Sequence, residues 1–120
     1  MVYSGSGGRL FIARDEEYEV VGTVGIIVSD EDLKKKSGEL VRLSVRNKSR
    51  GRGIGKYLLT FLIKYAKNEL KLSALHLETS NVLVSAYDLY VKYGFKETSR
   101  GFNSDTSISI FMELNLHSVE

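Results

Sequence analysis

Near the middle of the chain, the spacing of the apolar residues changes from that of a strand to that of a helix. Residues 39–45 alternate, which predicts a strand with the odd-numbered residues on one face. From Ile54 the apolar residues recur three and four positions apart, which predicts an amphipathic helix. Its apolar positions are Ile54, Tyr57, Leu58, Phe61, Leu62, Tyr65 and Ala66. A run with three glycines, Arg50–Gly55, connects the strand to this helix and overlaps its first residues.

Shorter apolar stretches on either side predict the rest of the fold. Stretches rich in β-branched or alternating residues predict strands at 10–13, 18–28, 74–78, 95–98 and 108–116. A second helix is predicted from Val82, Ala86, Leu89, Tyr90 and Tyr93 at helical spacing, with Gly94 as its C-terminal cap. A strand, a helix and a strand in succession form a crossover between parallel strands. The expected fold class is therefore α/β, a mixed sheet with the order ββ-β-α-β-α-β-β.

Length and composition limit what such a fold can do. The 120 residues suffice for a single domain, residues 1–120, of which residues 1–8 are expected to be flexible. The absence of cysteine excludes disulfides, thiolate metal sites and a cysteine nucleophile. A net charge of +2 is too small to indicate nucleic acid binding, and no apolar run reaches the roughly 18 residues of a membrane span. We expect a soluble chain, cytoplasmic by default.

The run Arg50–Gly55 has the features of an anion site. The first N–H groups of a helix have no intrahelical partner, and glycine lets an anion approach them without a Cβ clash. Arg50, Arg52 and Lys56 add positive charge where the helix dipole already favours an anion. A Walker loop would need glycine at position 50 and a GxGxxG loop would need glycine at position 56, so neither fits. A solvated glycine-rich turn is the alternative.

A second motif makes the interpretation of this loop more specific. RGRGIGK follows a strand and opens a helix, and LYVKYGF comes after the next strand, within the second helix and at its end. Together they resemble the acyl-CoA signature of the GNAT superfamily of N-acetyltransferases. The segments VVGTVG, LSV, RGRGIGKYLL, LETS and LYVKYGF are most similar to the camello-like branch. The resemblance covers residues 9–116. It implies acetyl-CoA as the acyl donor, no metal, and as acceptor a primary amine such as a protein lysine, an N-terminus or a cysteine conjugate.

The resemblance also implies which residues hold the acyl donor. The pyrophosphate is expected on the backbone amides of the glycine-rich loop, and the strand before the loop is expected to run alongside the pantetheine arm. The implied cofactor-binding residues are Leu43, Ser44, Val45, Arg50, Gly51, Arg52, Gly53, Ile54, Gly55 and Lys56.

The family pattern implies a general acid at Tyr90, the tyrosine of the LYxxxGF motif, which meets the departing CoA thiolate. A phenol of pKa near 10 that protonates a thiolate of pKa near 8.5 goes uphill by only about 2 kcal/mol. A core tyrosine is the alternative. Glu39 stands where the histone acetyltransferase branch has its glutamate base. The alternative is that Glu39 is an exposed carboxylate at the start of a strand with no role in catalysis. His76 and Glu78 share a face of the next strand and are the other candidate bases.

The resemblance does not include the N-terminal part of the family fold, and that part bears on whether the chain is an active enzyme. Family members begin with a strand and two helices that wall the acceptor site, and camello-like members often carry a membrane segment there. Neither has a counterpart here, so we expect an N-terminally truncated domain. A non-catalytic acyl-CoA-binding or protein-interaction module is therefore the alternative function, and an uncovered apolar sheet face would favour a homo-oligomer. Nucleic acid binding through Arg46, Lys48, Arg50 and Arg52 is disfavoured, because no aromatic residues are interleaved with them.

Overall fold

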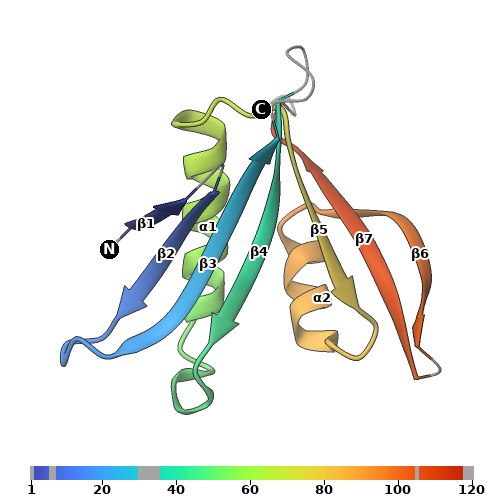
Figure 1. Ribbon diagram of the computed structural model, residues 1–120. Coiled ribbons are helices and arrows are strands. Elements are labelled where there is room, and N and C mark those ends of the chain that lie inside the picture. Colours follow the sequence, from blue (N-terminus) through green and yellow to red (C-terminus); the bar gives the residue numbers. More distant parts are fainter. Residues whose placement is uncertain (1, 6–7, 30–35, 105, 118–120) are drawn as a thin grey trace.

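A seven-stranded mixed sheet carries two helices on one of its faces (Figure 1). The computed structural model describes residues 2–5, 8–29, 36–104 and 106–117. The strands are β1 (Val2–Gly5), β2 (Gly8–Arg14), β3 (Val20–Ser29), β4 (Ser37–Val45), β5 (Ala74–Ser80), β6 (Lys96–Ser104) and β7 (Ser107–Asn115). The helices are α1 (Ile54–Asn68), α2 (Val84–Lys92) and the short 3-10 helix η1 (Asn47–Ser49). The predicted order of strands and helices is confirmed from β2 to β7.

The strands lie in the order β1-β2-β3-β4-β5-β7-β6. Among the described strands, only β4 and β5 are parallel neighbours, and α1 is the crossover between them, as predicted. The sequence pattern does not predict β1, which pairs antiparallel with β2 at the edge of the sheet. Flexibility of residues 1–8 stays a prediction.

The core lies between the two helices and the sheet face that they cover. Alternate residues of the strands supply one side of it, as the period of two requires. The fully buried side chains include Val24 and Ile26 of β3, Leu75 of β5, Met112 of β7, and Leu59 and Leu62 of α1. The predicted alternation of β7 is confirmed, because Ile110 and Met112 are buried whereas Phe111 and Glu113 are exposed.

The predicted apolar face of α1 is rotated in the structure. Leu59, which the predicted face omitted, is completely buried, whereas Tyr57 is 67% exposed and Phe61 is 37% exposed. The physical reason is that α1 packs mainly on β3 and β4, so the residues on its side toward β2 are covered only in part. Tyr57 and Phe61 line a cavity on that side.

The second helix begins later than predicted but ends where predicted. It starts at Val84, and Val82 is 63% exposed in the turn before it. At its end Gly94 has a φ of 100°. The Phe95 N–H donates to the Tyr90 carbonyl at 3.0 Å, and the Gly94 N–H donates to the Val91 carbonyl at 3.1 Å. This is the Schellman arrangement, and glycine is favoured there because its φ is positive.

The face of the sheet opposite the helices is open in the part of the chain described here. It carries Ile27, 48% exposed on β3, and Phe111, 40% exposed on β7. The same face carries a row of three polar residues that are paired across β4, β5 and β7. They are Glu39, His76 and Glu113. A homo-oligomer that covers this face stays a prediction.

Candidate functional site

The parallel strands β4 and β5 are paired only at their beginnings and then separate (Figure 1). Their register joins Ser37 to Ala74, Gly38 to Leu75 and Glu39 to His76. Beyond these pairs, β4 continues to Val45 and β5 to Ser80 with no further pair between them. Backbone N–H and C=O groups on the facing edges therefore lack sheet partners across the gap. Such groups are hydrogen-bonding positions for an extended ligand.

A cavity of about 440 Å³ occupies this opening and is called the strand cleft below. Its walls come from β4, β5, β7, α2 and the turn before α2. The lining residues are Glu39, Leu40, Val41, Arg42, Leu43, Glu78, Thr79, Ser80, Leu83, Ala86, Tyr90 and Ser109. The structure thus brings Tyr90, Glu39 and Glu78 to one cavity. His76 is not part of its lining.

A β-bulge in β4 changes which residues face the cleft. Thr23 pairs with Ser44 and Gly25 with Val41, so two residues of β4, Arg42 and Leu43, stand opposite one of β3. Arg42 has a φ of 54°, and its carbonyl accepts a 2.7 Å hydrogen bond from the Thr23 hydroxyl. The predicted alternation of odd-numbered residues is therefore wrong beyond the bulge, because the extra residue reverses the facing of the last residues of the strand.

After the bulge, the end of β4 leads directly to the glycine-rich loop. Leu43 packs against the core, and Val45 lies near Gly55, the second residue of α1. The predicted cofactor-binding residues on β4 are therefore continuous with those at the helix start. Leu43 lines the strand cleft itself, whereas Ser44 and Val45 do not.

The loop before α1 has the backbone geometry of an anion site. Gly51 and Gly53 have φ values of 82° and 80°, a region that side chains disfavour. A Cβ built on either glycine would meet nothing within 4 Å, so the space beside both is open. Gly53 is the N-cap of α1, and no side chain caps the free N–H groups there. With no acidic residue in the first turn and Lys56 within it, this helix end favours an anion.

Tyr90 is buried where the cleft meets the core. It is 6% exposed, and its ring meets Phe95 edge-on at a centroid distance of 5.6 Å. Burial raises the pKa of the Tyr90 phenol above its usual value of 10. The hydroxyl is therefore protonated throughout the neutral range and is available as a proton donor at the cleft.

Glu39 occupies the vertex of the cleft, at the last backbone pair before the strands part. Its side chain is half-buried, whereas that of Glu78 is exposed. His76 pairs with Glu39 on one side and with Glu113 on the other, so the imidazole belongs to the open face of the sheet. Of the three candidate bases, Glu39 alone combines partial burial with a place in the cleft.

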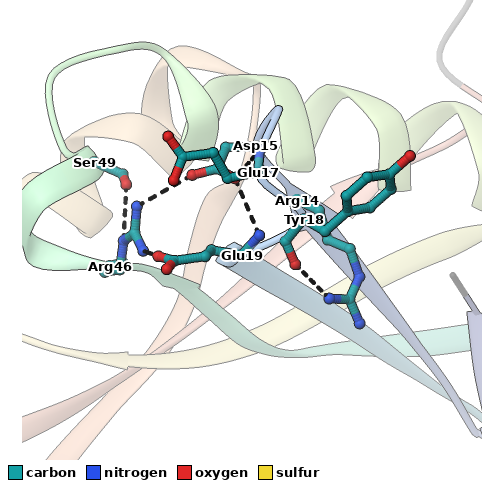
Figure 2. Close-up of polar contacts among 7 residues, drawn as sticks. All are labelled: Arg14, Asp15, Glu17, Tyr18, Glu19, Arg46 and Ser49. Carbon is teal, nitrogen blue, oxygen red and sulfur yellow. Dashed lines mark hydrogen bonds and ion pairs between the residues drawn. The ribbon is translucent and has the colours of Figure 1, made fainter.

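Arg46, just after β4, binds the β2–β3 turn to the loop before α1 (Figure 2). Its Nη1 donates to Glu19 at 2.7 Å, and its Nη2 lies 3.6 Å from an Asp15 oxygen. Its Nε donates to the hydroxyl of Ser49, which is 2% exposed. The guanidinium is thus engaged by protein groups and acts as a brace for the loop. No sequence pattern indicates this brace, since Asp15 and Glu19 lie far from Arg46 in the chain.

Two polar residues of the cleft were missed by the sequence pattern. Thr79 is 7% exposed and Ser109 is 8% exposed, on β5 and β7. Thr79 was detectable, because it continues the inward alternation of Leu75 and Leu77 with a hydroxyl in place of an apolar group. Nothing in the sequence pattern distinguished Ser109.

Neither a metal centre nor a membrane span is found among the described residues. No group of three or more His, Cys, Asp or Glu side chains is placed to hold an ion there. No helix in that part of the chain is long and apolar enough to cross a bilayer.

Comparisons with known proteins agree with this geometry. The family model described as Acetyltransferase (GNAT) family matches residues 3–95. Human N-acetyltransferase 8B is 40% identical over 101 residues, and human N-acetyltransferase 8 is 34% identical over 101 residues. Each match covers 83% of this chain and 44% of the relative, so the chain spans less than half the length of these proteins.

A solved structure of similar fold is an acetyltransferase of the GNAT family from Staphylococcus aureus. It is 30% identical, with a TM-score of 0.77, and the match covers 92% of this chain and 69% of that one. The predicted similarity to the camello-like branch is confirmed by the relatives named N-acetyltransferase 8 and 8B. Because the family model matches more than half of the chain, including the glycine-rich loop and the walls of the strand cleft from β4, β5 and α2, the chain belongs to the acetyltransferase (GNAT) family.

Proposed function

We propose that this chain transfers an acetyl group from acetyl-CoA directly to a primary amine. The observation that carries the proposal is that one cavity, between the separating ends of β4 and β5, is lined by Tyr90 and by Glu39. The glycine-rich start of α1 follows the same strand β4. A proton donor, a carboxylate and an anion site are thus arranged along one path.

The donor's two parts match two features of this path. The backbone amides from Gly51 to Lys56 would hold the pyrophosphate, with Arg50 and Arg52 adding charge. The Arg50 Nε donates to the Val45 carbonyl at 3.2 Å, which holds that guanidinium across the loop. The unpaired edges of β4 and β5 would accept and donate hydrogen bonds to the amides of the pantetheine arm.

Glu39 would take up a proton from the acceptor. An ammonium of pKa about 10.4 costs roughly 4 kcal/mol to deprotonate near pH 7.4, so a carboxylate that receives this proton lowers the barrier. The free amine then attacks the thioester carbonyl carbon, forming the C–N bond as the C–S bond breaks. The departing sulfur carries the negative charge.

Tyr90 would then meet that charge. Its protonated hydroxyl can donate a hydrogen bond or a proton to the sulfur, and its raised pKa keeps it in the donor state. The nitrogen that has attacked loses its remaining extra proton to water as the amide forms, and the phenolate regains a proton from water. The net reaction is acyl transfer with release of a CoA thiol, and no covalent enzyme intermediate is formed.

The test is thiol release from acetyl-CoA in the presence of small amines, lysine peptides and cysteine conjugates, with the acyl product identified by mass spectrometry. Because a general acid contributes about 10²- to 10⁴-fold, Tyr90→Phe should lower turnover by that order while acetyl-CoA affinity is kept. Tyr93→Phe, a phenol that does not line the cleft, is the matched control. Acetyl-CoA binding without turnover on any acceptor would favour the non-catalytic binding module.

A further inference from the structure

Helix α2 forms a wall of the strand cleft but is weakly supported at its start. It has nine residues, fewer than the roughly 12–15 that an isolated helix needs in water. No side chain caps its first turn, and Val82, Leu83 and Val84 are all more than half exposed. The position of α2 therefore depends on contacts that its later residues make.

Contacts at the C-terminal end of α2 are centred on Tyr90. The ring of Tyr90 packs against Phe95, and the Phe95 N–H donates to the Tyr90 carbonyl at 3.0 Å. Gly94 turns the chain toward β6 with its positive φ of 100°. These contacts fix Tyr90 relative to the turn that follows α2. A contact between the body of α2 and β6 would also fix the direction of the helix.

Such a contact is made by a tyrosine one helical turn before Tyr90. The Tyr87 hydroxyl donates to Glu97 of β6 at 2.6 Å. Arg100, also of β6, donates from Nε and Nη2 to the two oxygens of the same carboxylate, each at 2.7 Å. These three residues, Tyr87, Glu97 and Arg100, are called the Tyr87 clamp below. The bond from Tyr87 joins residues ten positions apart and so closes a segment that contains both Tyr90 and Phe95.

The Tyr87 clamp keeps its hydrogen bonds throughout the neutral pH range. The hydrogen bonds from Arg100 and then from Tyr87 lower the pKa of Glu97 to about 2, so this carboxylate is ionised and accepts. The hydrogen bond to Glu97 raises the pKa of Tyr87, so its hydroxyl stays protonated and donates. Two donors from one guanidinium also fix the plane of the carboxylate. Glu97 therefore presents an oxygen to Tyr87 in one orientation.

We propose that the Tyr87 clamp positions Tyr90 for proton donation in the strand cleft. The three clamp residues do not line the cleft, whereas Leu83, Ala86 and Tyr90 do. The clamp therefore acts through the helix, and its members are positioning residues. A reacting group displaced by about 1 Å can lose about 10²-fold in rate. The inference rests on the proposed function, because it takes Tyr90 to be the proton donor.

The kinetic test uses Tyr87→Phe, which removes the hydroxyl but keeps the ring. It should lower kcat by about tenfold, less than the roughly 10²- to 10⁴-fold contribution of a general acid, with the KM for acetyl-CoA nearly unchanged. Glu97→Gln keeps an oxygen that can accept from Tyr87, so it should retain most of the activity that Glu97→Ala loses. Tyr93→Phe, a phenol at the end of the same helix and outside the clamp, is the matched control.

A double-mutant cycle separates positioning from a general loss of structure. If the clamp acts through Tyr90, adding Tyr87→Phe to Tyr90→Phe should lower kcat no further. A further loss of the same size in that background would overturn the proposal, as would equal activity of Tyr87→Phe and the wild type. Thermal melts show that each variant is folded, since an exposed ion pair of this kind contributes little to stability.

A readout that needs no turnover is the titration of Tyr90 itself, followed by NMR of the chain labelled at the tyrosine ζ carbons. Burial raises the pKa of the Tyr90 phenol above 10, and release of α2 in Tyr87→Phe should lower that pKa toward 10. An unchanged Tyr90 midpoint would contradict the proposal. If no acceptor supports turnover in the wild type but the Tyr90 midpoint falls in Tyr87→Phe, the proposed function is wrong and the positioning of Tyr90 stands.

Discussion

Glu39 and His76 form the last backbone pair between the parallel strands β4 and β5, and the strand cleft opens directly beyond them. The pairing places both side chains on the open face of the sheet, but Glu39 lines the cleft and His76 does not. It predicts that the two side chains contribute differently to proton transfer.

Glu39→Gln should lower kcat by about 10²-fold or more, because a general base typically contributes 10²- to 10⁴-fold. It should also remove the acidic limb of the pH–rate profile. His76→Gln should leave both nearly unchanged, and Glu78→Gln is the matched carboxylate control within the cleft. The measurement is kcat against pH for all three variants. If Glu78→Gln lowered kcat more than Glu39→Gln, the general base would be Glu78 of β5 and not Glu39.

Gly51→Ala and Gly53→Ala should weaken donor binding and cost stability. Their positive φ values strain any side chain by about 1–2 kcal/mol, although the space beside each is open. Gly101→Ala is the control, because it too has open space and its φ is not among the positive ones. Urea unfolding should show a loss in the first two variants and a change within about 0.5 kcal/mol in the third. An equal loss of unfolding free energy in all three variants would show that positive φ is not the cause of the loss.

Leu59→Ala and Tyr57→Ala should differ sharply in stability although both residues lie on α1. Leu59 is completely buried, so its truncation should cost about 2–5 kcal/mol, whereas Tyr57 is mostly exposed and should cost little. Chemical denaturation of the two variants measures the difference. If Tyr57 proved the more costly of the two, the helix would have the rotation that its sequence pattern predicts.

A salt bridge within β6, which a tyrosine of α2 also joins, should make stability depend on acid pH. Arg100 donates two 2.7 Å hydrogen bonds to Glu97, and the Tyr87 hydroxyl donates another at 2.6 Å. These contacts, those of Arg100 first, lower the pKa of Glu97 to about 2. Because the folded pKa is depressed, the stabilisation is present above the unfolded value of 4.5 and is lost as the pH falls toward 2.

An NMR titration of the Glu97 carboxyl group measures this directly. The midpoint should lie near 2 in the wild type and move back toward 4.5 in Arg100→Gln. Lys92→Gln, which removes a positive charge on α2 without touching the pair, should leave the midpoint unchanged. A wild-type midpoint near 4.5 would show that solvent screens the pair completely.

Features set by local periodicity were predictable from the sequence. The course of α1 and the inward residues of β7 follow from repeats of 3.6 and 2 residues, and Gly94 ends α2 because glycine tolerates its positive φ. The glycine-rich loop was predictable for the same reason, since Gly51 and Gly53 are the residue type that its backbone requires.

Features set by contacts across the fold were not predictable. The bulge in β4 places a positive φ on Arg42, a residue type that carries no sign of it, and so reverses the facing of Val45. The rotation of α1 depends on which strands it covers, and the Arg46 brace depends on partners brought together by the β2–β3 turn. Tyr57 and Phe61, which this rotation leaves partly exposed, line the cavity on that side of α1.

The central claim is that the glycine-rich start of α1 and the strand cleft form one acyl-donor site. Calorimetric titration of the wild-type chain with acetyl-CoA, alongside a variant with Gly53 and Gly55 both changed to valine, tests it most directly. Micromolar binding by the wild type that the folded variant loses is the expected result. Absence of binding by the folded wild-type chain, or equal binding by both, would contradict it.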